Sequence, residues 1–134
     1  MDVAMLAERV EPVLRDAGTQ AAYLFGSRRD GTAGPSSDLD LAVLVGGPMG
    51  LLDEQRLAAE LESVLDVTVD VVVLDRASLE LRGRVVQEGA LVYRGDEPAR
   101  VAFEVRTRSE YLDFLPTLRE HTRRYLEHVA ERDG

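Results

Sequence analysis

An almost continuous apolar run from Val67 to Leu74, rich in valine, restricts the fold of this chain more than any other feature of its sequence. β-Branched residues favour extended backbone, and a run with almost no polar alternation is typical of a strand buried on both faces. Strands of this kind lie in sheets that have helices on both sides. The run therefore predicts an α/β (α+β) fold, in which helices flank one mixed β-sheet.

The other apolar segments supply the remaining elements of this arrangement. Together with the run at 67–74 they predict a sheet of about four strands, the other three lying at 21–25, 39–45 and 90–93. Apolar residues at helical spacing predict three helices, at 3–14, around 57–65 and at 78–87. A long C-terminal helix is predicted over about 97–130, because Asp96-Glu97-Pro98 is a favourable helix start.

Length and composition bound the class of protein. The 134 residues fit a single domain over 1–134, with the segment 97–130 as a helical tail. No apolar run approaches the roughly 18 residues that span a bilayer, and the acidic start Met1-Asp2 is unlike a signal peptide. The chain has no cysteine, which excludes disulfides, a thiolate nucleophile and a cysteine-type zinc site. We therefore expect a cytoplasmic protein with no membrane segment.

The charged residues are unevenly distributed. All sixteen basic residues are arginine, which excludes a Walker-type phosphate loop because that loop needs a lysine. Residues 1–99 carry nine arginines and eighteen acidic residues, hence the whole net charge of −9, whereas the part from Arg100 onward is balanced. Such a surface repels a phosphate backbone, so we expect no binding of long nucleic acid. A divalent cation or a basic protein partner fits better.

Three aspartates in the predicted strands are candidate metal ligands. Asp38 and Asp40 stand two residues apart at the start of one strand, so both side chains project to the same face. Two ionised carboxylates this close repel each other unless a cation lies between them. Asp70 interrupts the apolar run, where an unpaired charge is costly to bury. Carboxylate oxygens suit Mg²⁺, and three of them on adjacent strands can hold two ions about 4 Å apart.

The pair Gly26-Ser27 follows the strand at 21–25 and is separated by ten residues from Asp38-Leu39-Asp40. Glycine permits close approach of the backbone, and a serine at such a turn offers its hydroxyl and N–H groups to phosphate oxygens. Alone, Gly-Ser is usually a plain turn, Asp-x-Asp a solvated pair, and a single strand aspartate a residue at an exposed edge. Their joint order and spacing favour a site for a nucleoside triphosphate and Mg²⁺.

At these residues the sequence resembles the minimal nucleotidyltransferases of the DNA polymerase beta superfamily, whose third carboxylate lies where this chain has Asp70. The segments Gly89-Ala90-Leu91-Val92-Tyr93, 103–107 and 111–114 look like the MntA group of that family. The resemblance implies a polymerase-beta-like nucleotidyltransferase fold with ATP as substrate and two Mg²⁺ ions as cofactors. It implies that the ions are bound by the catalytic residues, which are Asp38, Asp40 and Asp70.

The resemblance also implies that Gly26 and Ser27 hold the triphosphate, although the chain departs from the family at one position. The family commonly has an arginine immediately before the glycine that aligns with Gly31, and this chain has Asp30 there. Arg28 or Arg29 is expected to supply that positive charge instead.

In function, the resemblance implies an adenylyltransferase that transfers AMP from ATP to a tyrosine of a HepT-like toxin, its partner in a hetero-oligomer. The chain would then be the antitoxin of a toxin–antitoxin pair. Two alternatives stay open: a small-molecule nucleotidyltransferase of the aminoglycoside-modifying type, and a non-catalytic antitoxin that neutralises its partner by binding. The stretch 46–52 fits equally well a lip over the nucleotide and a plain connecting loop.

Overall fold

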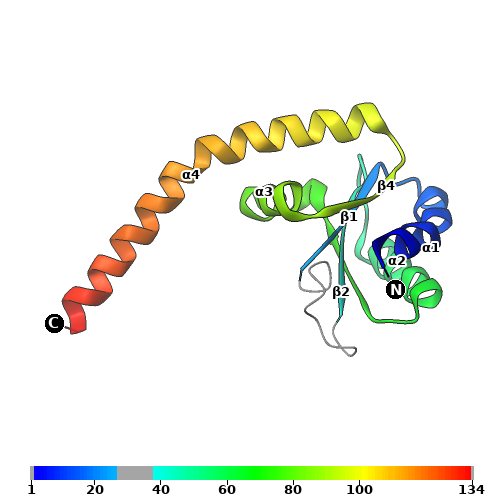
Figure 1. Cartoon of the computed structure of the whole chain (residues 1–134), viewed down its shortest axis with the longest axis horizontal. Coiled ribbons are helices and arrows are strands. Elements are labelled where there is room, and N and C mark those ends of the chain that lie inside the picture. The colour runs from blue at the N-terminus through cyan, green and yellow to red at the C-terminus, as the bar shows by residue number, and fades with distance from the viewer. Residues whose placement is uncertain (1, 27–37, 134) are drawn as a thin grey trace.

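Helices and strands follow one another in the order that the apolar pattern predicts. The computed structural model describes residues 2–26 and 38–133 (Figure 1). The elements are α1 (Val3–Asp16), β1 (Ala21–Phe25), β2 (Leu39–Leu44), α2 (Leu51–Leu65), β3 (Val69–Val73), the 3₁₀ turn η1 (Leu74–Arg76), α3 (Leu79–Glu88), β4 (Ala90–Arg94) and α4 (Glu97–Asp133). The largest difference from the prediction is at α2, which begins six residues before the expected Leu57.

Local side-chain chemistry determines where several elements begin or end. Asp2 caps α1 by accepting a hydrogen bond from the Met5 N–H at 2.8 Å, and Ser78 caps α3 by accepting one from the Leu81 N–H at 3.2 Å. At the C-terminal end of α2, Asp66 adopts a left-handed backbone with φ of 58°, and the chain then turns into β3.

The four strands form one mixed sheet in the order β3-β2-β1-β4. β2 runs parallel to β3, and β1 runs antiparallel to both of its neighbours. Figure 1 shows α1 and α2 on one side of this sheet, and α3 with the first half of α4 on the other. The mixed four-stranded sheet with flanking helices and a long last helix confirms the predicted fold class.

Alternate residues of the central strand β2 enter two separate cores. Leu39, Leu41 and Val43 pack in the core beneath α1 and α2. Ala42 and Leu44 pack in a smaller core beneath α3 and α4. Side chains alternate between the two faces of a strand, so Asp40 lies on the same face as Ala42 and Leu44.

The first half of α4 completes that smaller core. Phe103, Thr107 and Tyr111 are buried there at helical spacing. The ring of Tyr111 lies so close to Gly83 of α3 that a side chain at position 83 would collide with it. This close approach fixes the position of α4 on α3.

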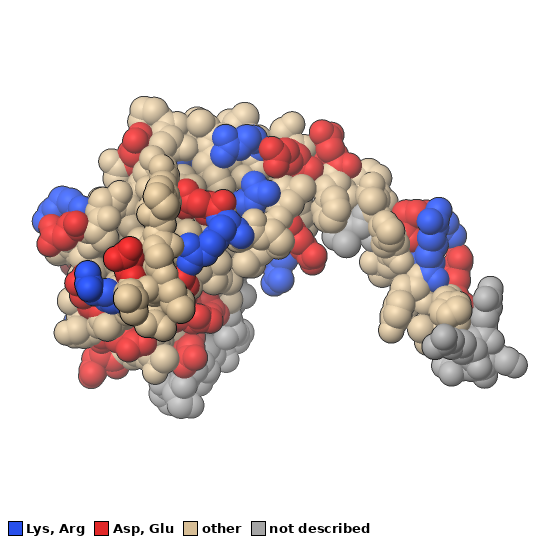
Figure 2. Space-filling view, turned by 180° about the vertical axis from the view of Figure 1, so that it is seen from behind, with Lys and Arg blue, Asp and Glu red and all other residues tan. Residues whose placement is uncertain are grey.

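The second half of α4 extends beyond the sheet and α3 (Figure 1). Tyr125 and Leu126 are 68% and 59% exposed there. Figure 2 shows side chains of both signs close together on this part of the helix, where Arg123 forms ion pairs within α4. In the part of the chain that the structure describes, no helix is both long and apolar enough to cross a membrane, α4 included.

The stretch 46–52 lies at the C-terminal end of β2, far from the end that carries Asp38 and Asp40. Asp75 of η1 accepts hydrogen bonds from the backbone N–H groups of Val45 and Gly46, both at 2.8 Å. This position favours a plain connecting loop over a lip that covers a nucleotide.

Candidate active site

Asp40 and Asp70 lie directly opposite each other on neighbouring strands. The parallel register of β2 and β3 pairs Asp40 with Asp70, and the antiparallel register of β1 and β2 pairs Asp40 with Phe25. Parallel neighbours in register project to the same face, about 4.8 Å apart. The fold therefore places these two carboxylates side by side on the sheet face beneath α3 and α4.

Asp38 precedes β2 and is exposed, as is Asp70, whereas Asp40 is half-buried. Burial raises the pKa of Asp40 above its ordinary value, and the negative charges of Asp70 and Asp38 raise the pKa further. All three carboxylates thus interact electrostatically. A cation placed among them would relieve this repulsion and favour the ionised form of Asp40.

The carboxylates at this site are a donor set that fits a hard cation. Within residues 2–26 and 38–133, no three acidic, histidine or cysteine side chains converge closely enough to enclose a metal ion. Asp40 and Asp70 nevertheless form a pair, and Mg²⁺ usually takes only one or two carboxylates from a protein, with water and substrate phosphate completing its shell. The structure thus brings two of the three predicted ligands together and places Asp38 near them.

Gly26, at the end of β1, has a structural reason to be glycine. Its φ of +86° lies in the left-handed region that side chains disfavour. A Cβ atom at this position would collide with the Oδ2 atom of Asp40. The backbone after β1 therefore passes directly beside the Asp40 carboxylate, where a nucleotide phosphate bound by a cation would lie close to backbone N–H groups.

The other predicted phosphate-binding residues, Ser27, Arg28 and Arg29, lie in 27–37, outside the described residues.

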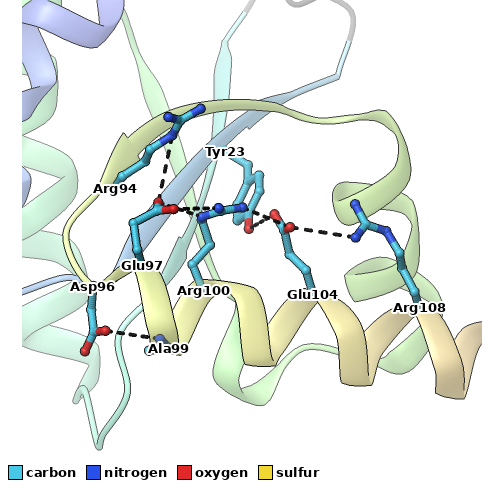
Figure 3. Close-up of polar contacts among 8 residues, drawn as sticks. All are labelled: Tyr23, Arg94, Asp96, Glu97, Ala99, Arg100, Glu104 and Arg108. Carbon is cyan, nitrogen blue, oxygen red and sulfur yellow. Dashed lines mark hydrogen bonds and ion pairs between the residues drawn. The ribbon is translucent and has the colours of Figure 1, made fainter.

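A hydrogen-bonded network that the sequence analysis did not predict links the same sheet face to α4 (Figure 3). The Tyr23 hydroxyl donates to Oε1 of Glu104 at 2.6 Å, linking β1 to α4. Arg100 donates to the other oxygen of Glu104 at 2.9 Å and also pairs with Glu97. Burial and the hydrogen bond to Glu104 raise the pKa of Tyr23, so its hydroxyl stays protonated and donating.

This network holds α4 on β1, the strand that precedes Gly26. Tyr23 lies three residues before Gly26, and its partner Glu104 is 81 residues away in sequence. No local pattern signals a contact of this range. The only signal in the sequence is the placement of Tyr23 and Phe25 on one face of β1, two residues apart.

Comparison with known proteins adds a sequence match to this geometry. The family described as "Polymerase beta, Nucleotidyltransferase" matches residues 8–98. The protein adenylyltransferase MntA of Shewanella oneidensis is 39% identical over 92 residues, which cover 69% of this chain and 66% of that protein. The match therefore spans just under two thirds of that relative's length.

Solved structures match over a larger part of the chain. A toxin–antitoxin crystal structure with AMP-PNP is 32% identical with a TM-score of 0.73, and the match covers 92% of this chain and 97% of that one. A structure of the tri-AMPylated HEPN toxin of Shewanella oneidensis in complex with its MNT antitoxin matches with 30% identity and a TM-score of 0.70. This match covers 95% of this chain and 98% of that one. Both sequence and fold are thus similar to nucleotidyltransferases that occur with toxins.

Proposed function

We propose that this chain, which belongs to the polymerase beta nucleotidyltransferase family, is an Mg²⁺-dependent adenylyltransferase that moves AMP from ATP to a hydroxyl group of a protein. The observation that carries the proposal is the register pair of Asp40 and Asp70, with Asp38 close enough to raise the pKa of Asp40. Paired carboxylates beside a glycine with close backbone approach suit a magnesium nucleotide. The AMP-PNP in a similar structure supports ATP as the donor. Because ATP is available in the cytoplasm, we propose that the chain acts there.

Each residue of the site has a proposed role. Asp40 and Asp70, together with Asp38, would hold Mg²⁺, which supplies charge neutralisation for the phosphates and lowers the pKa of the acceptor hydroxyl. Gly26 and Ser27 would bind the triphosphate, with Arg28 or Arg29 adding positive charge. The Gly26 backbone supports this role, because its turn passes beside the Asp40 carboxylate.

The proposed reaction is an in-line displacement at the α-phosphorus. The acceptor oxygen forms a bond to the α-phosphorus while the bond to the bridging oxygen breaks, and pyrophosphate leaves with that oxygen. The hydroxyl proton passes to a carboxylate, and Asp70 suits this role because it is exposed on the edge strand β3.

We propose a tyrosine of a HepT-like toxin as the acceptor, so that the chain acts as an antitoxin. The AMP groups on the toxin in a similar complex support a protein acceptor. The exposed Tyr125 and Leu126 on the second half of α4 support it further, since exposed apolar side chains along one helix are typical of protein interfaces. A tyrosine hydroxyl, with a pKa near 10, also needs less activation than a serine hydroxyl.

Intact-mass spectrometry of the product of the neighbouring gene, expected to be the toxin, tests the proposal. After incubation with this protein, ATP and Mg²⁺, we expect the toxin to gain one or more AMP units of about 329 Da each. Asp38→Asn and Asp40→Asn should each reduce the transfer rate by at least about 1000-fold, because each removes a metal-binding charge from the site.

Glu8→Gln is the matched control, because it removes one negative charge from an exposed position on α1. Its transfer rate should equal that of the native chain. Native transfer rates in Asp40→Asn would contradict the assigned site. A stable complex with no mass gain, even in the native chain, would instead indicate neutralisation by binding alone.

A further inference from the structure

A groove lies between α1 and α2, on the sheet face opposite to Asp40. Its volume is about 720 Å³, and α1, α2 and the loop after β2 line it. The apolar part of its lining includes Pro12, Val13, Pro48, Met49 and Val64. The sheet separates this groove from the candidate active site, because Asp40 belongs to the face beneath α3 and α4.

The wall formed by the loop after β2 is held in place by η1. Asp75 accepts hydrogen bonds from two successive backbone N–H groups of this loop, at Val45 and Gly46. Arg76 donates to the carbonyl oxygen of Met49 at 2.8 Å and also pairs with Glu54 at the start of α2. The loop is therefore tied to the body of the molecule at both ends of the wall, and an occupant would meet a preformed surface.

The rim of the groove is acidic. Asp16, Asp53 and Glu60 lie on it, against one arginine, Arg56. The segment 1–99, which contains the whole groove, carries eighteen acidic residues and nine arginines. Both the rim and the segment 1–99 carry a net negative charge, so they favour a positively charged occupant. A second copy of this chain would bring a charge of the same sign and is disfavoured.

We propose that the α1–α2 groove docks an amphipathic, arginine- or lysine-bearing helix of a protein partner. The apolar side chains of such a helix, spaced at i, i+3, i+4 and i+7, would enter the groove, and its basic side chains would meet the carboxylates on the rim. Because the groove and the candidate active site lie on opposite faces of the sheet, this partner binds without covering the nucleotide site. The proposal stands independently of the adenylyltransferase reaction.

Fluorescence anisotropy with the full chain and a labelled peptide tests the groove. The probe is an amphipathic helical peptide of about 14 residues, with leucines on one face and arginines on the other. We expect saturable binding that weakens with added salt, because the contacts with the rim are electrostatic. A peptide with glutamate in place of each arginine should bind at least about tenfold more weakly.

Paired variants locate the binding. Val64, which lines the groove, and Val105, on the exposed side of α4, are both partly exposed valines. Val64→Arg should weaken binding of the basic peptide at least about tenfold, because the arginine fills the groove and adds a positive charge there. Val105→Arg should leave the binding unchanged. Thermal unfolding followed by circular dichroism verifies that both variants are folded.

Three outcomes would overturn the proposal. One is no saturable binding of the basic peptide, and another is equal weakening by Val64→Arg and Val105→Arg. The third is self-association of the native chain, abolished by Val64→Arg, which would make a second copy the occupant.

Discussion

The two faces of the sheet bury different kinds of side chain. Beneath α1 and α2, the buried cluster consists of leucine, valine and alanine alone. The opposite face carries Asp40 and Tyr23, and Thr107 of α4 is buried on that side. The aliphatic face thus supplies stability from well-packed side chains, whereas the opposite face accommodates the carboxylates of the proposed site and the polar groups that fix α4.

Adjacent residues of β2 test this difference most strongly. Leu41 is fully buried in the aliphatic face, so Leu41→Ala should lower the free energy of unfolding by about 2–5 kcal/mol. Asp40→Asn should leave that free energy unchanged or raise it, because it removes repulsion from Asp70. Urea denaturation of both variants measures the two effects. A large loss of stability in Asp40→Asn would show that the carboxylate supports the fold.

Gly26→Ala tests how closely the glycine turn is fitted to the polar face. The new methyl group would collide with the Asp40 carboxylate, and the positive φ adds about 1–2 kcal/mol of strain. We expect the transfer rate of the folded protein to fall roughly 100-fold, because the carboxylate is displaced.

Gly18→Ala is the matched control for this strain. Gly18 also has a positive φ, +72°, but beyond its chain neighbours no atom of the described residues lies within 4 Å of an added Cβ. Gly18→Ala should lose about as much stability as Gly26→Ala from this strain, and it should keep the native transfer rate. Equal rates in the two variants would show that the collision with Asp40 has no catalytic consequence.

Tyr23→Phe tests the link between the polar face and α4. It removes the hydrogen bond to Glu104 and should lower the free energy of unfolding by about 1–2 kcal/mol. Tyr125→Phe, at a hydroxyl on an exposed side chain, should change it by less than about 0.5 kcal/mol. Chemical denaturation compares them, and equal values would mean that the network of Figure 3 adds nothing to stability.

Thr107→Val should have the smallest effect, and the opposite sign. The Thr107 hydroxyl oxygen is buried and has no hydrogen-bond partner among the described residues, so its removal should stabilise the protein by about 1 kcal/mol. Thr19→Val should instead destabilise it by about 1 kcal/mol, because the buried Thr19 hydroxyl donates to the carbonyl oxygen of Leu14 at 2.8 Å. Differential scanning calorimetry measures both signs.

Sequence patterns predicted the aliphatic face better than the polar one. Strands such as 21–25 were predictable because their apolar residues form short runs between turn residues, and the structure has a strand with those bounds. The start of α2 was missed, since Leu51 and Leu52 are exposed and out of phase with Leu57, and Gly50 is a weak helix signal.

The candidate site was predictable where its residues are local in sequence. Asp38, Asp40 and Asp70 stand out as charges in or beside apolar strands, and the structure places two of them in register. The contact between Tyr23 and Glu104 was not predictable, because it depends on where α4 crosses the sheet. The α1–α2 groove was missed for the same reason: two helices and a loop form it together.

The mutual repulsion of the clustered carboxylates has an evolutionary consequence. Under the proposed function, a single-nucleotide change from aspartate to asparagine at position 40 would end catalysis while removing that repulsion from the fold. Selection for stability alone would therefore drive lineages toward inactive descendants that keep the same surfaces. Under the proposed function, retention of all three acids therefore reflects selection for the chemistry and not for stability.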